Sequence, residues 1–203
     1  MNVYVESNFV LEHALEQEDY DSCVKIIGLA ANRRITLILP PFSLAEPHQA
    51  ISGKAKARAR LREDLRIHLS ELGRSRQYRE IPASFDALAA ALIASAQFER
   101  KGVRRTVNAL LQASEIIPLD VSILQSAAAL ELECGLSGQD SIVLASVLAH
   151  LETNAPAESC FLNRNSKDFD DPGIRERLDA FQCKFFAKFA PGLAYILVRL
   201  KQA

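Results

Sequence analysis

Four acidic residues stand where a folded chain could gather them: Glu6, Glu46, Asp140 and Asp168. Three of them follow the apolar runs at 3–5, 35–41 and 160–163, and Asp140 opens a helical pattern that leads back into the third run. The carboxyl ends of parallel strands meet at one edge of a sheet, where ligands collect. We therefore expect the four carboxylates to converge. Their mutual repulsion costs several kcal/mol unless protons or a cation neutralise it.

The residue types point to a hard divalent cation. Carboxylate oxygens without cysteine or histidine ligands favour Mg²⁺ or Mn²⁺ over zinc. The cysteines lie far apart in the sequence and form no C-x-x-C pair, which argues against a zinc site and a disulfide framework and favours reduced thiols in the core; they are Cys23, Cys134, Cys160 and Cys183.

Each carboxylate also has a purely structural interpretation. Asp140 and Glu46, in first helical turns, could complement the helix dipole at about 0.3–1 kcal/mol each. Glu46 also fits a capping box with Ser43, in the pattern S-x-x-E. Glu6 is harder to explain in this way, because a charge that closes a buried strand is costly without a partner.

Strand and helix patterns alternate along the 203 residues. Short apolar runs predict strands at 3–5, 35–41, 115–120, 160–163 and 181–186. Helical spacing and capping residues predict helices at 9–17, 21–32, from Ser43 into the basic segment, from Ser84 to about Gly102, 103–113, 121–134, 138–152 and from Pro191. This alternation predicts an α/β domain with a central parallel sheet and helices on both faces.

The charges are distributed unevenly. The formal net charge is −1, yet residues 54–79 hold nine basic and three acidic residues, a local excess of +6. We therefore expect one domain spanning 1–203, enlarged by a basic helical insertion at 54–114. The apolar content of 49% is that of a globular protein. No apolar run approaches the roughly 18 residues of a membrane span, so a cytoplasmic location is expected.

Nucleotide-binding signatures do not occur in the sequence. G-x-G-x-x-G is missing after the first strand, and G-x-x-x-x-G-K-[ST] occurs nowhere, so neither a dinucleotide nor a P-loop nucleotide is supported.

Four segments, in order, carry a resemblance. They are V-Y-V-E-S-N at the start, F-S-L-A-E-P after the second strand, G-L-S-G-Q-D-S-I-V-L-A-S in the C-terminal half and F-L-N-R-N-S-K-D-F after the next strand. Together they resemble the motifs of PIN-domain nucleases, over residues 1 to about 186. The resemblance implies a three-layer α/β/α sandwich and an endoribonuclease that depends on Mg²⁺ or Mn²⁺. Many members are the toxin of a toxin–antitoxin pair, inhibited by a small antitoxin and often dimeric.

The resemblance assigns roles to individual residues. Glu6, Glu46 and Asp140 match the first three acidic positions, Asn165 and Asp168 match the last motif, and Ser7 with Asn8 matches the small polar pair that orients the first carboxylate. One position departs from the family, whose first acidic residue is normally aspartate. Glu6 is one methylene longer, which moves its carboxylate by roughly 1.5 Å.

The main hypothesis is an RNA-cleaving hydrolase. Glu6, Asp140 and Asp168 hold the metal, Asn165 completes the shell, and Glu46 orders or deprotonates the attacking water. The phosphate backbone is held by Arg164, Lys54, Lys56, Arg58 and Arg62. A solvated helix face or a docking surface for an acidic partner are the alternatives for this basic segment.

Two other functions stay open at this point. The first is a PIN-like module, weakened or inactive because of Glu6, that binds RNA or a partner protein. The second is a phosphatase or another phosphoryl-transfer enzyme of similar architecture, which the lack of a D-x-D strand end disfavours.

Overall fold

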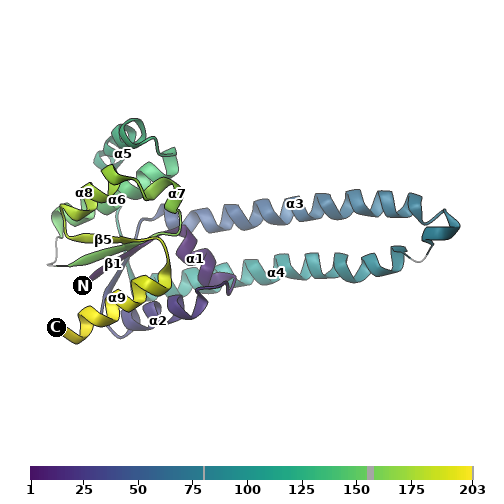
Figure 1. Cartoon of the computed structure of the whole chain (residues 1–203), viewed down its shortest axis with the longest axis horizontal. Coiled ribbons are helices and arrows are strands. Elements are labelled where there is room, and N and C mark those ends of the chain that lie inside the picture. The colour runs from purple at the N-terminus through teal and green to yellow at the C-terminus, as the bar shows by residue number, and fades with distance from the viewer. Residues whose placement is uncertain (80, 155–157, 203) are drawn as a thin grey trace.

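The core of the protein is a five-stranded sheet whose strands are all parallel. The computed structural model describes residues 1–79, 81–154 and 158–202. The spatial order of the strands is β3-β2-β1-β4-β5 (Figure 1). Their bounds are β1 Asn2–Val5, β2 Thr36–Leu39, β3 Ser114–Ile116, β4 Ser159–Leu162 and β5 Cys183–Phe186. The five strands lie where the apolar runs predict them.

Helices cover both faces of this sheet, as β1 shows. Val3 and Val5 join an apolar cluster with α1 (Ser7–Ala14), α2 (Tyr20–Ala31) and α9 (Phe189–Gln202). Tyr4, between them, joins a second cluster with α5 (Val121–Cys134), α6 (Gly138–Thr153) and α8 (Pro172–Asp179). All three side chains are fully buried, because a central parallel strand has helices on either side. The expected three-layer α/β/α arrangement is therefore confirmed.

The helices that follow the strands are short, with two exceptions. Their bounds are α1 Ser7–Ala14, α2 Tyr20–Ala31, α3 Phe42–Leu72, α4 Ile81–Ala113, α5 Val121–Cys134, α6 Gly138–Thr153, α7 Ser166–Phe169, α8 Pro172–Asp179 and α9 Phe189–Gln202. A 3₁₀ turn, η1, spans Arg76–Tyr78 between the two long helices. Among the described helices, none is long and apolar enough to cross a membrane.

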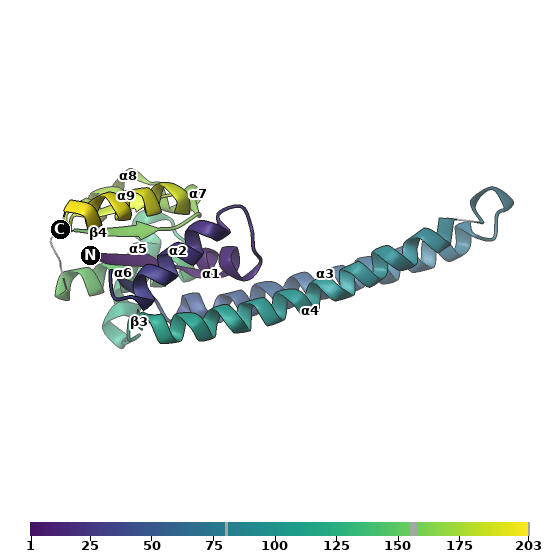
Figure 2. The same ribbon diagram turned by 90° about the horizontal axis from the view of Figure 1, so that it is seen from below.

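The two long helices, α3 and α4, form an antiparallel hairpin that projects from the sheet domain (Figures 1 and 2). We call this hairpin, residues 42–113, the arm. The segment 54–114, predicted as a basic helical insertion, lies almost entirely within this hairpin, which begins earlier, at the first residue of α3.

Two boundary predictions for the arm were wrong. Residues 81–113 form one helix, so no helix begins at Ser84 and none ends at Gly102. The side chain of Ser84 lies outside the described part of the chain. Gly102 instead passes the backbone of Ala14 in α1. The capping box is also absent: α3 begins at Phe42, and the buried hydroxyl of Ser43 finds no hydrogen-bond partner among the described residues.

The register of the arm is fixed by one partly buried ion pair. Arg58 of α3 donates to Glu99 of α4 at 2.8 Å and to the Ser95 hydroxyl at 3.1 Å. The Glu99 side chain is only 11% exposed, whereas that of Arg58 is 30% exposed. A polar pair at such a seam restricts how two helices slide past each other.

Removing Arg58 should destabilise the arm locally. Arg58→Ala leaves the Glu99 carboxylate with little water and no cation, and we expect a loss of about 2 kcal/mol in the free energy of local opening. Hydrogen exchange of the α4 amides around residue 99 measures this loss. Arg66→Ala is the matched control, because its ion pair with Glu63 is exposed on both sides and should contribute far less to stability. Equal losses in the two variants would contradict the prediction.

Candidate functional site

Glu6 closes β1 and begins the edge at which the site is expected. Its carboxylate is turned back onto its own helix: the Ser7 hydroxyl donates to Oε2 at 2.7 Å, and the Asn8 backbone N–H donates to Oε1 at 3.3 Å. Glu6 is thus the N-cap of α1. Ser7 and Asn8 hold the first carboxylate, in the orienting role assigned to them from the sequence.

The Glu6 carboxylate is held in a poorly solvated position. The residue is 5% exposed. Burial raises the pKa of Glu6 to about 7, the two hydrogen bonds from Ser7 and Asn8 oppose that rise, and the negative charge of Glu46 adds to it. Glu46 is therefore close enough for its negative charge to disfavour that of Glu6, as expected for carboxylates at one edge.

The raised pKa predicts a specific dependence of stability on pH. Between the ordinary value of 4.5 and about 7, the folded state keeps a proton that the unfolded state has lost. The free energy of unfolding therefore falls as pH rises through this window. In EDTA, we expect the wild type to lose about 3 kcal/mol relative to Glu6→Gln between pH 5 and pH 8. Urea denaturation across this range measures the difference, and parallel curves for the two proteins would contradict it.

Asn163 connects the segments of the edge, and sequence reasoning missed it. It follows β4 directly and is fully buried. Its Oδ1 accepts from the Asn8 side-chain amide at 2.7 Å and from the Asn165 backbone N–H at 2.8 Å. The Asn165 amide in turn reaches Asp140 Oδ1 at 3.5 Å. We call Asn8, Asn163, Asn165 and Asp140 the asparagine chain. The one signal in the sequence is a polar residue at the end of an apolar strand run.

Asp140 lies in the first turn of α6, as predicted. The Ser137 hydroxyl donates to Asp140 Oδ2 at 2.7 Å, and the Asp140 N–H donates back to the Ser137 oxygen at 3.2 Å. Asp140 is half-buried. Its second oxygen, Oδ1, faces the Asn165 amide. Asp140 therefore stabilises the helix start and also faces the last motif.

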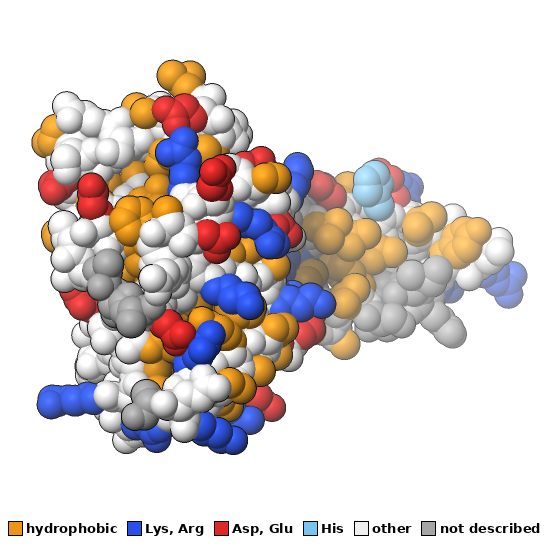
Figure 3. Space-filling view, turned by 60° about the vertical axis from the view of Figure 1, so that its left-hand side comes forward, with side chains coloured by type: hydrophobic (Ala, Val, Ile, Leu, Met, Phe, Trp, Pro, Cys, Tyr) orange, Lys and Arg blue, Asp and Glu red, His pale blue; other side chains and the backbone are white. Residues whose placement is uncertain are grey.

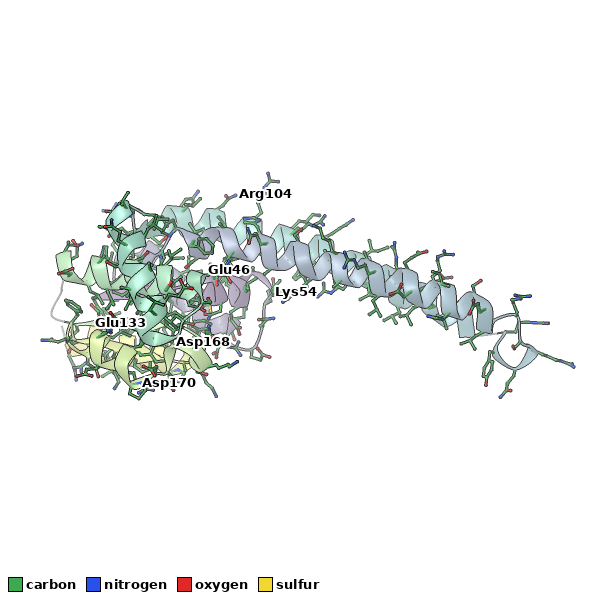
Figure 4. All side chains as sticks on the ribbon, turned by 90° about the horizontal axis from the view of Figure 1, so that it is seen from above. Glu46, Lys54, Arg104, Glu133, Asp168 and Asp170 are labelled. Carbon is green, nitrogen blue, oxygen red and sulfur yellow. The ribbon has the colours of Figure 1, made fainter. Side chains whose placement is uncertain are left out.

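Asp168 and Glu46 are half-buried side chains of α7 and α3. Figure 4 shows both residues, with Lys54, at the end of the sheet domain from which the arm leaves. Within the described ranges, neither carboxylate forms a hydrogen bond or an ion pair with another side chain. Both are therefore available to a ligand.

The carboxylate and amide oxygens at this edge are the kind of ligand that Mg²⁺ and Mn²⁺ prefer. One buried oxygen also supports a metal at this edge. Asn8 Oδ1 is a buried oxygen for which the described part of the chain offers no donor. A cation would also relieve the repulsion between Glu6 and Glu46. The described side chains, however, form no group of three or more His, Cys, Asp or Glu residues that could hold a metal ion. The structure brings the segments to one edge but not three carboxylates to one point.

The sequence analysis assigned Arg164 to holding the phosphate backbone of RNA. In the structure, the Arg164 side chain is engaged by two carboxylates. Its guanidinium forms an ion pair with Glu12 of α1, which is 1% exposed, and a second one with Glu18 at 3.3 Å. Glu12, missed from the sequence, is a buried carboxylate, and Arg164 supplies the positive charge that such a group needs. The pair ties the loop after β4 to α1, so Arg164 is a positioning residue here.

A cavity of about 300 Å³ lies beside this ion pair. Asn8, Glu12, Glu18, Lys54 and Arg164 contribute to its lining. Lys54 and Asn8 therefore line the same cavity, which places Lys54 next to the asparagine chain.

The other predicted RNA contacts lie further out on the arm. Lys56 is exposed on α3, and Arg58 is engaged by Glu99. Arg62 lines a groove of about 200 Å³ together with Arg58 and Arg100. Lys54 and Arg164 therefore line one cavity, and Arg58 and Arg62 line another.

No protein-family model, curated protein or solved structure matches this chain.

Proposed function

We propose that the chain is a metal-dependent endoribonuclease of the PIN-domain type, which hydrolyses RNA phosphodiester bonds. The observation that carries the proposal is the asparagine chain. It links three of the four motif segments through hydrogen bonds of 2.7, 2.8 and 3.5 Å. The fourth segment, that of Glu46, lies close enough to raise the pKa of Glu6.

The residues at this edge would have different roles in the reaction. Glu6, Asp140 and Asp168 would hold Mg²⁺ or Mn²⁺, with Asn165 beside Asp140. When bound, such a cation supplies positive charge to the scissile phosphate and lowers the pKa of water. Glu46, half-buried and without a partner in the described chain, accepts the proton of the attacking water. The water oxygen bonds to phosphorus and the bond to the 3′ oxygen breaks. That oxygen takes a proton from solvent and leaves as a 3′-hydroxyl, opposite a 5′-phosphate.

Lys54 contributes binding rather than chemistry. It lies on the cavity that also includes Asn8, so a phosphate next to the scissile one could contact its ammonium group. Contacts of this kind do not read sequence, and affinity should fall steeply with salt.

The resemblance extends the proposal to the cellular context. A cytoplasmic ribonuclease of this kind would be controlled by a small antitoxin protein in a toxin–antitoxin pair, and it would act as a homodimer.

A second candidate is a non-catalytic module that binds RNA or a protein. The observation that favours it is the Glu6 carboxylate, which is occupied by Ser7 and Asn8 as a helix cap. This candidate predicts that RNA is retained but left intact with every divalent ion.

The two candidates are separated by one assay. Purified protein is mixed with labelled RNA and Mn²⁺, and in parallel with EDTA. Cleavage with Mn²⁺ that stops in EDTA supports the nuclease, and the product ends should be 3′-hydroxyl and 5′-phosphate. RNA that is bound but uncut supports the binding module. Cleavage that continues in EDTA would contradict both proposals.

A further inference from the structure

The arm lacks a core of its own. From residue 52 to residue 98, none of the described side chains is buried. Instead, large apolar side chains of the arm are 43–54% exposed: Leu61, Ile67, Leu72, Leu88, Ile93 and Phe98. Figure 3 shows such side chains gathered on one face of the arm. Because most helical stability comes from packing against other elements, a two-helix arm of this kind needs a covering surface.

A second apolar surface lies on α5. Ile123, Ala127 and Leu130 face the core, which leaves the opposite side of the helix outside. That side carries Val121 and Leu132, which are 70% and 88% exposed. Leucine exposed to this extent on a regular helix marks a candidate contact with another protein.

The charges around the two surfaces are opposite. The arm contains thirteen basic and seven acidic residues, a net charge of +6, so the chain total of −1 leaves −7 for the rest. The segment 106–163 contains seven acidic residues and not one Lys or Arg. α5 and α6 belong to this segment. Opposite potentials on two apolar surfaces steer them together.

The groove on the arm fits the end of α5 in detail. It is lined by the apolar side chains Ala55, Ala59, Ile93 and Ala96 and by Arg58, Arg62 and Arg100, which we call its arginine rim. The last turn of α5 reads Glu131-Leu132-Glu133, and Glu133 forms an ion pair with Arg177 at 2.6 Å, so Glu131 supplies the charge beside Leu132. A groove lined by apolar and cationic side chains is the complement of this exposed leucine and its neighbouring carboxylate.

We propose that the arm of one copy binds the end of α5 of a second copy, with Leu132 in the groove and Glu131 near Arg62 or Arg100. A two-fold axis makes the contact reciprocal, because each copy offers one arm and one α5. The exposed leucines favour a protein over RNA as the occupant of the outer arm, since phosphate contacts require only the charges. This inference does not depend on nuclease activity.

The mass of the full chain in solution tests the contact. By light scattering after size exclusion, the wild type should be a dimer of twice 22.4 kDa. Leu132→Arg should raise the dissociation constant at least about tenfold, because it places a cation against the arginine rim. Val198→Arg, at a 52% exposed position of α9, is the matched control and should leave the dimer unchanged.

A mixing experiment tests the reciprocity. Ile93→Arg fills the groove, and its chain should also be monomeric at concentrations where the wild type is dimeric. When the Ile93→Arg and Leu132→Arg chains are mixed, one arm–α5 contact is intact, so a heterodimer should form. An arm-to-arm dimer would instead be insensitive to Leu132→Arg.

Three results would overturn the proposal. They are a monomeric wild type that associates only when RNA is added, a Leu132→Arg chain that stays dimeric, and a mixture of the two variants that forms no heterodimer.

Discussion

Asp140→Asn should reduce the rate of RNA cleavage by at least about a hundredfold while the protein stays folded. The substitution keeps the side chain in the first turn of α6, where the Ser137 hydroxyl still has an oxygen to bond. It removes the negative charge that faces Asn165 across 3.5 Å. Without that charge, the edge loses one of the carboxylates assigned to the cation. Initial rates on labelled RNA in Mn²⁺ measure the effect.

The control for this prediction tests whether removing a carboxylate far from this edge also lowers the cleavage rate. Glu176→Gln removes one carboxylate from the exposed surface of α8 and should leave the rate within about twofold. The expected loss of stability in Asp140→Asn is only the helix-dipole contribution, about 0.3–1 kcal/mol. Unchanged cleavage by Asp140→Asn would reject the assignment of the site.

The strands and their common edge could be predicted because parallel sheets leave strong local signals. Each strand is a short apolar run that ends in turn residues, as with Val5 before Glu6. Once the strands are parallel, their ends must share an edge, so the placement of Glu6 and Asp140 follows from order alone. The long arm could be anticipated in part from its charge and helical spacing.

The contacts that could not be predicted are those of side chains whose partners are distant in the sequence. Nothing near Arg164 reveals that Glu12, in α1, will neutralise it. Asn163 looks like any polar residue after a strand until its two hydrogen bonds are seen. The positions of carboxylates relative to one another also depend on rotamers, and the Glu6 side chain turns toward its own helix rather than toward a shared point.

Gly102→Ala should strongly destabilise the protein, because Gly102 is where the arm crosses α1. A Cβ at this position would lie 2.2 Å from the backbone oxygen of Ala14, which cannot move without shifting α1. We expect a loss of about 3 kcal/mol in the free energy of unfolding, measured in urea. Gly28→Ala in α2 is the matched control: no atom lies within 4 Å of its added Cβ, so the substitution should gain about 0.5–1 kcal/mol. Because α1 is capped by Glu6 and carries Asn8, a shift of this helix would also disturb the asparagine chain. If Gly102→Ala were as stable as Gly28→Ala, the close crossing of α4 and α1 would be wrong, and with it the way the arm is anchored beside the site.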